Sequence, residues 1–261
     1  MTNRRQVLAQ VQVAMMLLTR LPAGNLTAGN LTGPIPKLRD AAWAFSLVGL
    51  GVGVISALGL LLALWLGVPP AVAAGLALSV GILVTGGLHE DGLADLADGF
   101  GGGQTRARKL EIMRDSRIGS YGTLALILSI GLRWQALAAI ASDSWVWAAC
   151  ALIAVATLSR AGLPAMMVVL PAARDDGLGQ QAAGGDWTGA GIAATIGLVA
   201  AVILLGPVTG FLAICSAAIA CMALGGLAQR QIGGQTGDVL GAAQQVAEIA
   251  IWTVLAGAIL S

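Results

Sequence analysis

One short acidic stretch holds most of the side chains that could do chemistry. Asp91, Asp95 and Asp98 follow one another at i, i+4 and i+7. On a helix these positions share one face, and three neighbouring carboxylates repel one another unless a cation lies between them. Oxygen ligands with a single histidine nearby, His89, and no thiolate favour Mg²⁺ or Mn²⁺ over zinc. The spacing therefore predicts a metal site; the alternative is an ordinary solvated acidic helix end.

A basic stretch follows the acidic one. Arg114 and Arg117 are three residues apart, so a helical turn would place both guanidinium groups on one side. Arginine recognises phosphate through paired hydrogen bonds, and Ser116 and the backbone of 119–122 could add donors. The simpler alternative is that these charges only orient the chain in a membrane. Beside an acidic metal site, however, arginines favour transfer at a phosphate.

Further charged residues lie within or beside apolar segments. Asp238 precedes the last apolar segment, where it could cap a helix or join the acidic site. Arg160 and Glu248 fall inside apolar segments, where a charge needs a partner. We therefore treat Arg160 as a functional candidate and predict that Glu248 faces either Arg160 or the metal. Arg133 also lies inside such a segment, and we interpret it as structural.

The elements that must position these residues are membrane-spanning helices. The chain has 261 residues, of which 57% are hydrophobic and only 10% charged, too few charges to cover a water-soluble protein of this size. A net charge of +1 argues against a nucleic-acid partner. The apolar runs are continuous and rich in alanine and leucine, which favours helices over a barrel. Seven are long enough to span: 41–66, 70–88, 121–141, 144–169, 189–205, 208–227 and 239–260.

Lysine and arginine set the predicted orientation. They gather on the side of the N-terminus and of the 89–120 and 170–188 loops, whereas the turns at 142–143 and 206–207 and the C-terminus have none. This asymmetry predicts an N-terminus inside and a C-terminus outside, with the acidic stretch facing the cytoplasm. Residues 6–21 are apolar but short, which indicates an interfacial or re-entrant helix, and 22–36 reads as a loop. We expect one all-α domain, a polytopic bundle over 1–261.

In its polar segments the sequence resembles the cobalamin synthase family, the adenosylcobinamide-GDP ribazoletransferases. The matching residues are Thr19-Arg20-Leu21-Pro22, Gly86-Gly87-Leu88-His89, Asp91-Gly92-Leu93-Ala94-Asp95, Asp98-Gly99, Met113-Arg114-Asp115-Ser116-Arg117-Ile118-Gly119, Ser159-Arg160 and Thr236-Gly237-Asp238 with Leu240-Gly241-Ala242. Glu90 stands where many members of the family carry an apolar residue, and it is kept as a further metal candidate.

The resemblance implies an enzyme of the bacterial cytoplasmic membrane that uses Mg²⁺ to join adenosylcobinamide-GDP to α-ribazole or its 5′-phosphate, releasing GMP. It implies catalytic roles for Asp91, Asp95, Asp98 and Asp238, metal ligation by Asp91, Asp95 and Asp98, and substrate contacts from His89, Arg114, Asp115, Ser116, Arg117 and Arg160. The partners are then small-molecule substrates and the lipid bilayer, while a homo-oligomer stays open. A cation-coupled transporter is the alternative, although the acids lie at span ends and no inverted repeat is visible.

Overall fold

The computed structural model describes residues 4–22 and 35–258, and these residues fold into helices joined by short connections. Within those two ranges the only β-type pairing is a single bridge between Ala172 and Gln235. Most of the predicted 22–36 loop, the end of the last predicted span and the C-terminal Ser261 lie outside the described residues. The prediction of an all-α membrane bundle is confirmed.

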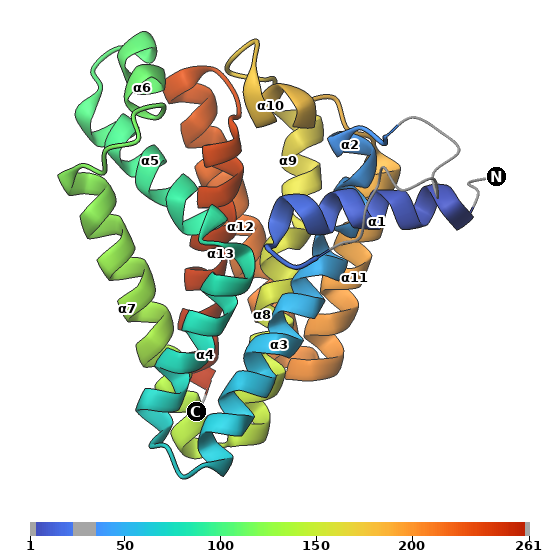
Figure 1. The fold of residues 1–261 in the computed structure, drawn as a ribbon, viewed down its shortest axis with the longest axis vertical. Helices are drawn as coiled ribbons and strands as arrows, with labels where there is room; N and C mark the ends of the chain where they lie inside the picture. Colours follow the sequence, from blue (N-terminus) through green and yellow to red (C-terminus); the bar gives the residue numbers. More distant parts are fainter. Residues whose placement is uncertain (1–3, 23–34, 259–261) are drawn as a thin grey trace.

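Six apolar helices of the described chain are long enough to cross a membrane. They are α3 (Phe45–Trp65) preceded by α2 (Leu38–Ala41) and η1 (Ala42–Ala44), α7 (Ser120–Asp143), α8 (Trp145–Ala161) continued by α9 (Leu163–Val169), α11 (Trp187–Leu205), α12 (Pro207–Ile232) and α13 (Gly237–Ala258). They run roughly along the long axis of the bundle (Figure 1). These segments match six of the seven predicted spans to within a few residues, because continuous apolar runs leave little choice of boundary.

The remaining predicted span is broken. α4 (Pro70–Thr85) ends at Gly86 and Gly87, whose φ angles of 66° and 70° suit glycine. α5 (Leu88–Gly102) then leaves at 87° to α4, so the pair forms a seventh span only if both halves are counted together. The prediction that 89–120 is a loop is therefore wrong, because this segment contains α5 and α6 (Arg106–Ile112).

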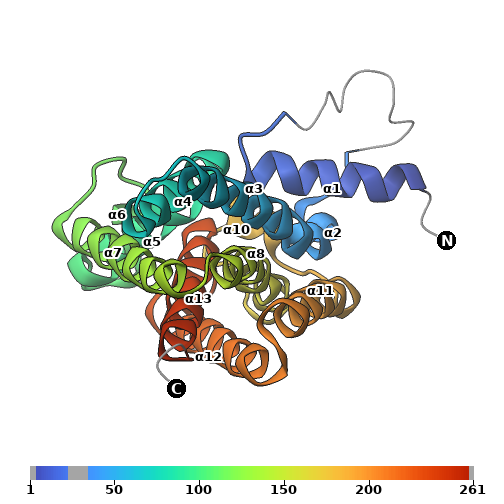
Figure 2. The ribbon, with the colours of Figure 1, turned by 90° about the horizontal axis from the view of Figure 1, so that it is seen from below.

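The N-terminal helix does not run with the others. α1 (Arg4–Leu18) has 15 residues and lies across the bundle in both views (Figures 1 and 2). Its partners include Trp43, whose indole Nε1 donates to the Gln10 side chain at 2.8 Å. α1 is not among the helices that are long and apolar enough to span, and the prediction of an interfacial or re-entrant helix stays a prediction. The residues after α1 lie beside the α4–α5 bend, where the Arg20 backbone N–H donates to the Val84 carbonyl at 2.7 Å.

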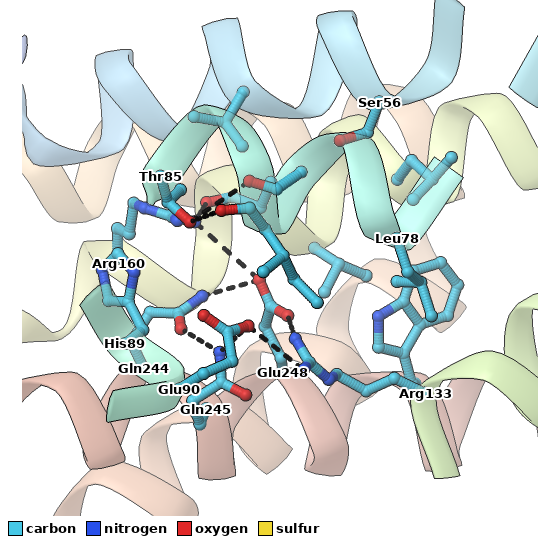
Figure 3. Close-up of a pocket in the computed structure, with 17 residues that line it drawn as sticks. Ser56, Leu78, Thr85, His89, Glu90, Arg133, Arg160, Gln244, Gln245 and Glu248 are labelled. Atoms are coloured by element: carbon cyan, nitrogen blue, oxygen red, sulfur yellow. Dashed lines mark hydrogen bonds and ion pairs between the residues drawn. The ribbon is translucent and has the colours of Figure 1, made fainter. Parts of the chain in front are cut away.

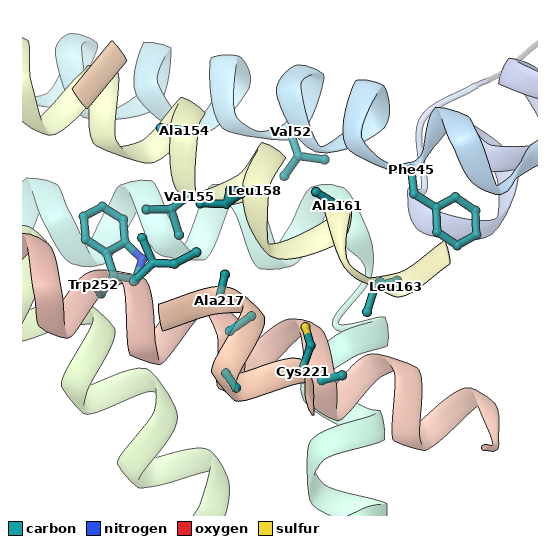
Figure 4. Close-up of a cluster of buried hydrophobic side chains, with 14 of the residues drawn as sticks. Phe45, Val52, Ala154, Val155, Leu158, Ala161, Leu163, Ala217, Cys221 and Trp252 are labelled. Carbon is teal, nitrogen blue, oxygen red and sulfur yellow. The ribbon is translucent and has the colours of Figure 1, made fainter. Parts of the chain in front are cut away.

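Small residues let the central helices pack closely. A Cβ on Gly49 or Gly53 of α3 would collide with the backbone of α8, so only glycine permits this approach. The side chains between the helices form one apolar core that includes Val52, Leu158 and Trp252 (Figure 4). All three cysteines, Cys150, Cys215 and Cys221, are free.

Polar connections gather at one end of this bundle. The end that carries α6 and α10 (Gly177–Ala182) holds the connections around 103–119, 170–186 and 233–236 (Figure 1). The opposite end holds only short connections, around 66–69, 144 and 206. The charged connections thus lie at one end of the bundle and the short uncharged turns at the other, as predicted, with α5 at the polar end.

Candidate active site

Two of the predicted aspartates line the same cavity. Asp91 and Asp95 of α5 border a space of about 640 Å³ that also touches the end of α1, the α4–α5 bend and the connection before α7. Arg20 and Ser116 line it as well. Arg20 packs so closely on the bend that a Cβ at Gly86 would collide with its side chain. We name this space the aspartate cavity.

The third aspartate of the row has other partners. The Asp98 carboxylate accepts hydrogen bonds from the backbone N–H groups of Gly119, at 2.6 Å, and Gly122, at 2.9 Å. A Cβ at either glycine would collide with that carboxylate. Asp98 therefore caps the start of α7 from another helix, because it accepts hydrogen bonds from N–H groups that have no partner within α7.

A fourth carboxylate reaches α5 from the last helix. At Gly92 an added Cβ would lie 3.0 Å from the Asp238 carbonyl oxygen and 3.3 Å from the Gly241 Cα, so α5 and α13 are almost in backbone contact there. The Asp238 carboxylate accepts from the Thr236 hydroxyl at 3.2 Å and lies 3.9 Å from Arg174. The sequence left helix capping and a role in the site open, and the structure brings Asp238 to the acidic row.

The charges around Asp95 are mostly negative. Asp91, Asp238 and Asp98 all repel its charge, in that order, and Arg174 opposes them. In the described chain, no group of three or more His, Cys, Asp or Glu side chains is placed to hold a metal by itself. Mg²⁺, however, is usually bound by one or two carboxylates together with substrate phosphates and water. Asp91 and Asp95 fit such a site, which a phosphorylated substrate would complete.

The basic stretch does not form the predicted helical turn. α6 ends at Ile112, and Arg114 and Arg117 lie in the irregular connection before α7, so the expectation that one helical face carries both is wrong. Hydrogen bonds from Arg117 lower the pKa of Asp115 to about 2. The Arg117 side chain is 86% exposed and faces Asp115, while Arg114 pairs with Asp176. The two arginines therefore have separate environments.

Arg114 borders a second, basic cleft. This space of about 610 Å³ is lined by Arg106, Arg114 and Arg174 between α6 and the 173–175 connection. Arg106 is fixed by donating to the Ile232 and Ala173 carbonyls at 2.7 and 2.9 Å. One terminal nitrogen of the Arg174 guanidinium donates to the Leu110 carbonyl at 2.8 Å, and the other lies 3.9 Å from the Asp238 carboxylate. Burial lowers the pKa of Arg174. Arg174 thus connects the basic cleft to the carboxylates.

Glu90, Arg133, Arg160 and Glu248 form a buried polar network around a second cavity (Figure 3). Arg133 bridges two helices by donating to Glu248 at 2.8 Å and to Glu90 at 3.2 Å. Glu248 also lies 3.8 Å from Arg160, as predicted, and Glu90 accepts from the Gln245 amide at 3.0 Å. Glu90 is therefore bonded to one cation, Arg133, and one amide, Gln245, and does not line the aspartate cavity with Asp91 and Asp95.

Three polar atoms of this region have no hydrogen-bond partner within the described ranges: His89 Nε2, Glu90 Oε2 and Arg160 Nε. All three residues border an interior cavity of about 40 Å³ (Figure 3). His89 is almost fully buried, and it also lines an apolar cavity on the other side of α5. Arg160 lines only the interior cavity among the cavities described above.

The structure thus brings together some of the predicted residues and adds two others. Asp91, Asp95 and Ser116 share the aspartate cavity, with Asp238 on the neighbouring helix. Arg20 and Arg174 were not predicted as site residues. Arg20 lies in a matching segment, Thr19 to Pro22, which was a usable signal, whereas Arg174 lies outside the matching segments and nothing in the sequence singled it out.

Nearly the whole chain matches a known family. Residues 10–256 match the model of cobalamin-5-phosphate synthase. The chain belongs to this family. A relative from Bradyrhizobium diazoefficiens, named adenosylcobinamide-GDP ribazoletransferase, is 48% identical over 97% of this chain and 95% of its own. Relatives of the same name from Azorhizobium caulinodans and Mesorhizobium japonicum are 46% and 42% identical, over 94% and 98% of this chain and 94% and 96% of theirs. No solved structure matches.

Family membership confirms the resemblance inferred from the polar segments and decides against the transporter alternative. It leaves the roles of individual residues to the geometry described above.

Proposed function

We propose that this chain joins adenosylcobinamide-GDP to α-ribazole or its 5′-phosphate and releases GMP, a late step of vitamin B12 assembly. The observation that carries the proposal is the aspartate cavity, where Asp91 and Asp95 face Arg20 and Ser116 in a chain of this family. A volume of about 640 Å³ falls within the range of about 300–1,000 Å³ that is typical of small-molecule sites.

The reaction exchanges a phosphoanhydride bond for a phosphoester bond. A ribose hydroxyl of α-ribazole attacks the phosphorus that stays with cobinamide, and a new oxygen–phosphorus bond forms. The bond from that phosphorus to the oxygen of GMP breaks, and GMP leaves with the electron pair. The hydroxyl proton passes to a carboxylate, for which Asp91, Asp95 and Asp238 are the candidates.

The side chains of the site divide this work. Asp91 and Asp95 would hold Mg²⁺ with the diphosphate of the substrate. The chemistry supplied by a bound Mg²⁺ is neutralisation of charge on the phosphates. Arg20 faces the same cavity and can bind phosphate oxygens, and Arg114 and Arg174 offer further guanidinium groups for the departing GMP. Asp98 holds α7 against α5 and so supports the cavity wall.

We further propose that the chain lies in the bacterial cytoplasmic membrane with this site on the cytoplasmic side. The connections at the polar end carry the lysines and arginines, and those at the opposite end carry none. Adenosylcobinamide-GDP and α-ribazole 5′-phosphate are charged and soluble, so they can reach a site on the cytoplasmic side without crossing the bilayer.

The test is turnover by the purified protein in liposomes with both substrates and Mg²⁺, measuring GMP and the corrinoid product. We expect stoichiometric GMP and product from the parent. Asp95→Asn should lower the rate by at least about 100-fold, because a neutral amide is a poorer metal ligand and base. Asp143→Asn, an exposed aspartate at the far end of α7, is the matched control. No GMP from a folded parent would refute the proposal, and equal rates for Asp95→Asn would remove that residue from it.

A further inference from the structure

A second cavity adjoins the aspartate cavity on the apolar side of α5. It has a volume of about 190 Å³ and lies between α1, α5, α9, α10 and α13. Most of its wall is apolar, and its lining includes Leu17, Leu18, Phe45, Leu163, Met167 and Leu178. We name it the apolar cavity.

The apolar cavity and the aspartate cavity share part of their walls. Leu17, Leu88 and Asp91 line both spaces. Asp238 lines the apolar cavity beside Asp91, so two carboxylates border a space whose wall is mainly apolar. A ligand that fills the apolar cavity and continues toward Asp91 must therefore have an apolar part joined to a polar part.

The size of the apolar cavity limits what that part can be. A volume of about 190 Å³ is below the range of about 300–1,000 Å³ that is usual for whole ligands. It suits one ring system, not a nucleoside or a corrin. Of the groups that the two substrates carry, the benzimidazole base of α-ribazole is flat, bicyclic, uncharged and bears two methyl groups. Guanine is polar on its edges and would leave several hydrogen-bonding groups unpaired against leucine and methionine.

We propose that the apolar cavity binds the benzimidazole base of α-ribazole, with the ribose at Asp91, where the two cavities meet; this inference rests on the proposed function. The base then sits among Phe45, Leu163 and Met167, and the ribose hydroxyl points into the aspartate cavity that holds the diphosphate. His89 lines the apolar cavity beside Asp91 and Asp238. The arrangement gives each substrate its own space and one meeting point.

Ala182 offers a direct test, because it is fully buried and lines the apolar cavity with only a methyl group. Ala182→Leu fills part of the space. We expect the KM for α-ribazole 5′-phosphate to rise by at least about 10-fold, because a misfit of a single methylene in an apolar pocket is already worth about 10- to 200-fold. The KM for adenosylcobinamide-GDP should change by less than about twofold. Ala183→Leu changes the next residue, which lines neither cavity, and should behave like the parent.

A smaller base separates a filled cavity from a damaged protein. α-Ribazole 5′-phosphate without the two ring methyl groups should recover at least about tenfold in kcat/KM with Ala182→Leu, while the parent should prefer the methylated ring. A misfolded variant would not be rescued in this way. Leu178→Ala, at a side chain that is 39% exposed and therefore tolerant, widens the cavity and should reduce the parent's preference for the methyl groups.

The outcomes distinguish this proposal from the one on which it rests. If the parent makes product but Ala182→Leu keeps the parental KM for α-ribazole 5′-phosphate, the base binds elsewhere. Undiminished discrimination between the two bases by Leu178→Ala would likewise overturn the assignment. A parent that releases no GMP contradicts the proposed function instead.

Discussion

Arg133 should stabilise the bundle strongly, and the loss in the free energy of unfolding on its replacement can be worked out from its contacts. Its side chain is 3% exposed and holds Glu248 at 2.8 Å and Glu90 at 3.2 Å. Two arginines, Arg133 and Arg160, and two glutamates, Glu90 and Glu248, give this network a net charge of zero. Arg133→Met removes one positive charge and leaves the network at −1 in the interior. Breaking a buried pair in this way costs about 3–5 kcal/mol in the free energy of unfolding.

The expected change is large enough to measure by thermal unfolding in detergent. For a chain of this size, 1 kcal/mol corresponds to about 2–4 °C in Tm, so Arg133→Met should lower Tm by about 6–20 °C. Arg230→Met is the control, because Arg230 is exposed in the last turn of α12. A charge at a helix end is worth about 1 kcal/mol at most in such a setting, so its Tm should fall by no more than about 4 °C.

A second substitution tests whether charge balance is the cause. Arg133→Met with Glu90→Gln returns the network to zero, with Arg160 and Glu248 left as a pair. We expect this double variant to be more stable than Arg133→Met alone, a coupling that independent sites would not show. Equal Tm values for Arg133→Met and Arg230→Met, or a double variant less stable than the single one, would refute the reasoning.

Three further predictions concern the polar end. Asp98→Asn removes a charged acceptor from the Gly119 and Gly122 N–H groups, so Tm should fall by about 3–12 °C for a loss of about 1.5–3 kcal/mol; an unchanged thermal transition would contradict the capping role. Arg114→Lys should raise the KM for adenosylcobinamide-GDP by at least about tenfold, because lysine lacks the planar fork, whereas Arg117→Lys should match the parent in initial-rate assays. The reverse order would assign phosphate binding to Arg117. In a chain without its natural cysteines, Asp143→Cys should react with an impermeant reagent added to intact cells and Gln104→Cys should not; the opposite pattern would invert the proposed orientation.

Much of the fold could be predicted because hydropathy alone decides which segments enter a bilayer. The spans formed by α3, α7, α8 with α9, α11, α12 and α13 all follow from continuous apolar runs. The break between α4 and α5 was harder to predict. The apolar run ends at Leu88, which reads as the end of a span, but the direction of a chain after Gly86 and Gly87 depends on the helices that pack around it. The many charged residues of the 89–120 segment then led to its prediction as a loop.

The candidate site was only partly predictable, since helical spacing gives direction and not distance. Asp91 and Asp98 share a face of α5, yet seven residues of helix separate them by about 10.5 Å along the axis. Short aspartate side chains that far apart can serve different partners, and Asp98 bonds the start of α7. Sharing of one Mg²⁺ by all three aspartates stays a prediction, and the geometry favours Asp91 with Asp95. Arg174 meets Asp238 only through tertiary packing, so no local pattern could reveal it.

The arrangement of α5 explains why one short helix carries so many acids. Glu90 faces the buried network and ties α5 to α7 and α13, and Asp98 fixes its far end to the start of α7. Those two anchors leave Asp91 and Asp95 to face the aspartate cavity without moving when a highly charged substrate binds. Pre-positioned groups of this kind lower the barrier because they need no reorganisation during the reaction. Substitutions at Glu90 and Asp98 should therefore act on stability and through it on rate, whereas substitutions at Asp91 and Asp95 should act on the rate of a folded protein.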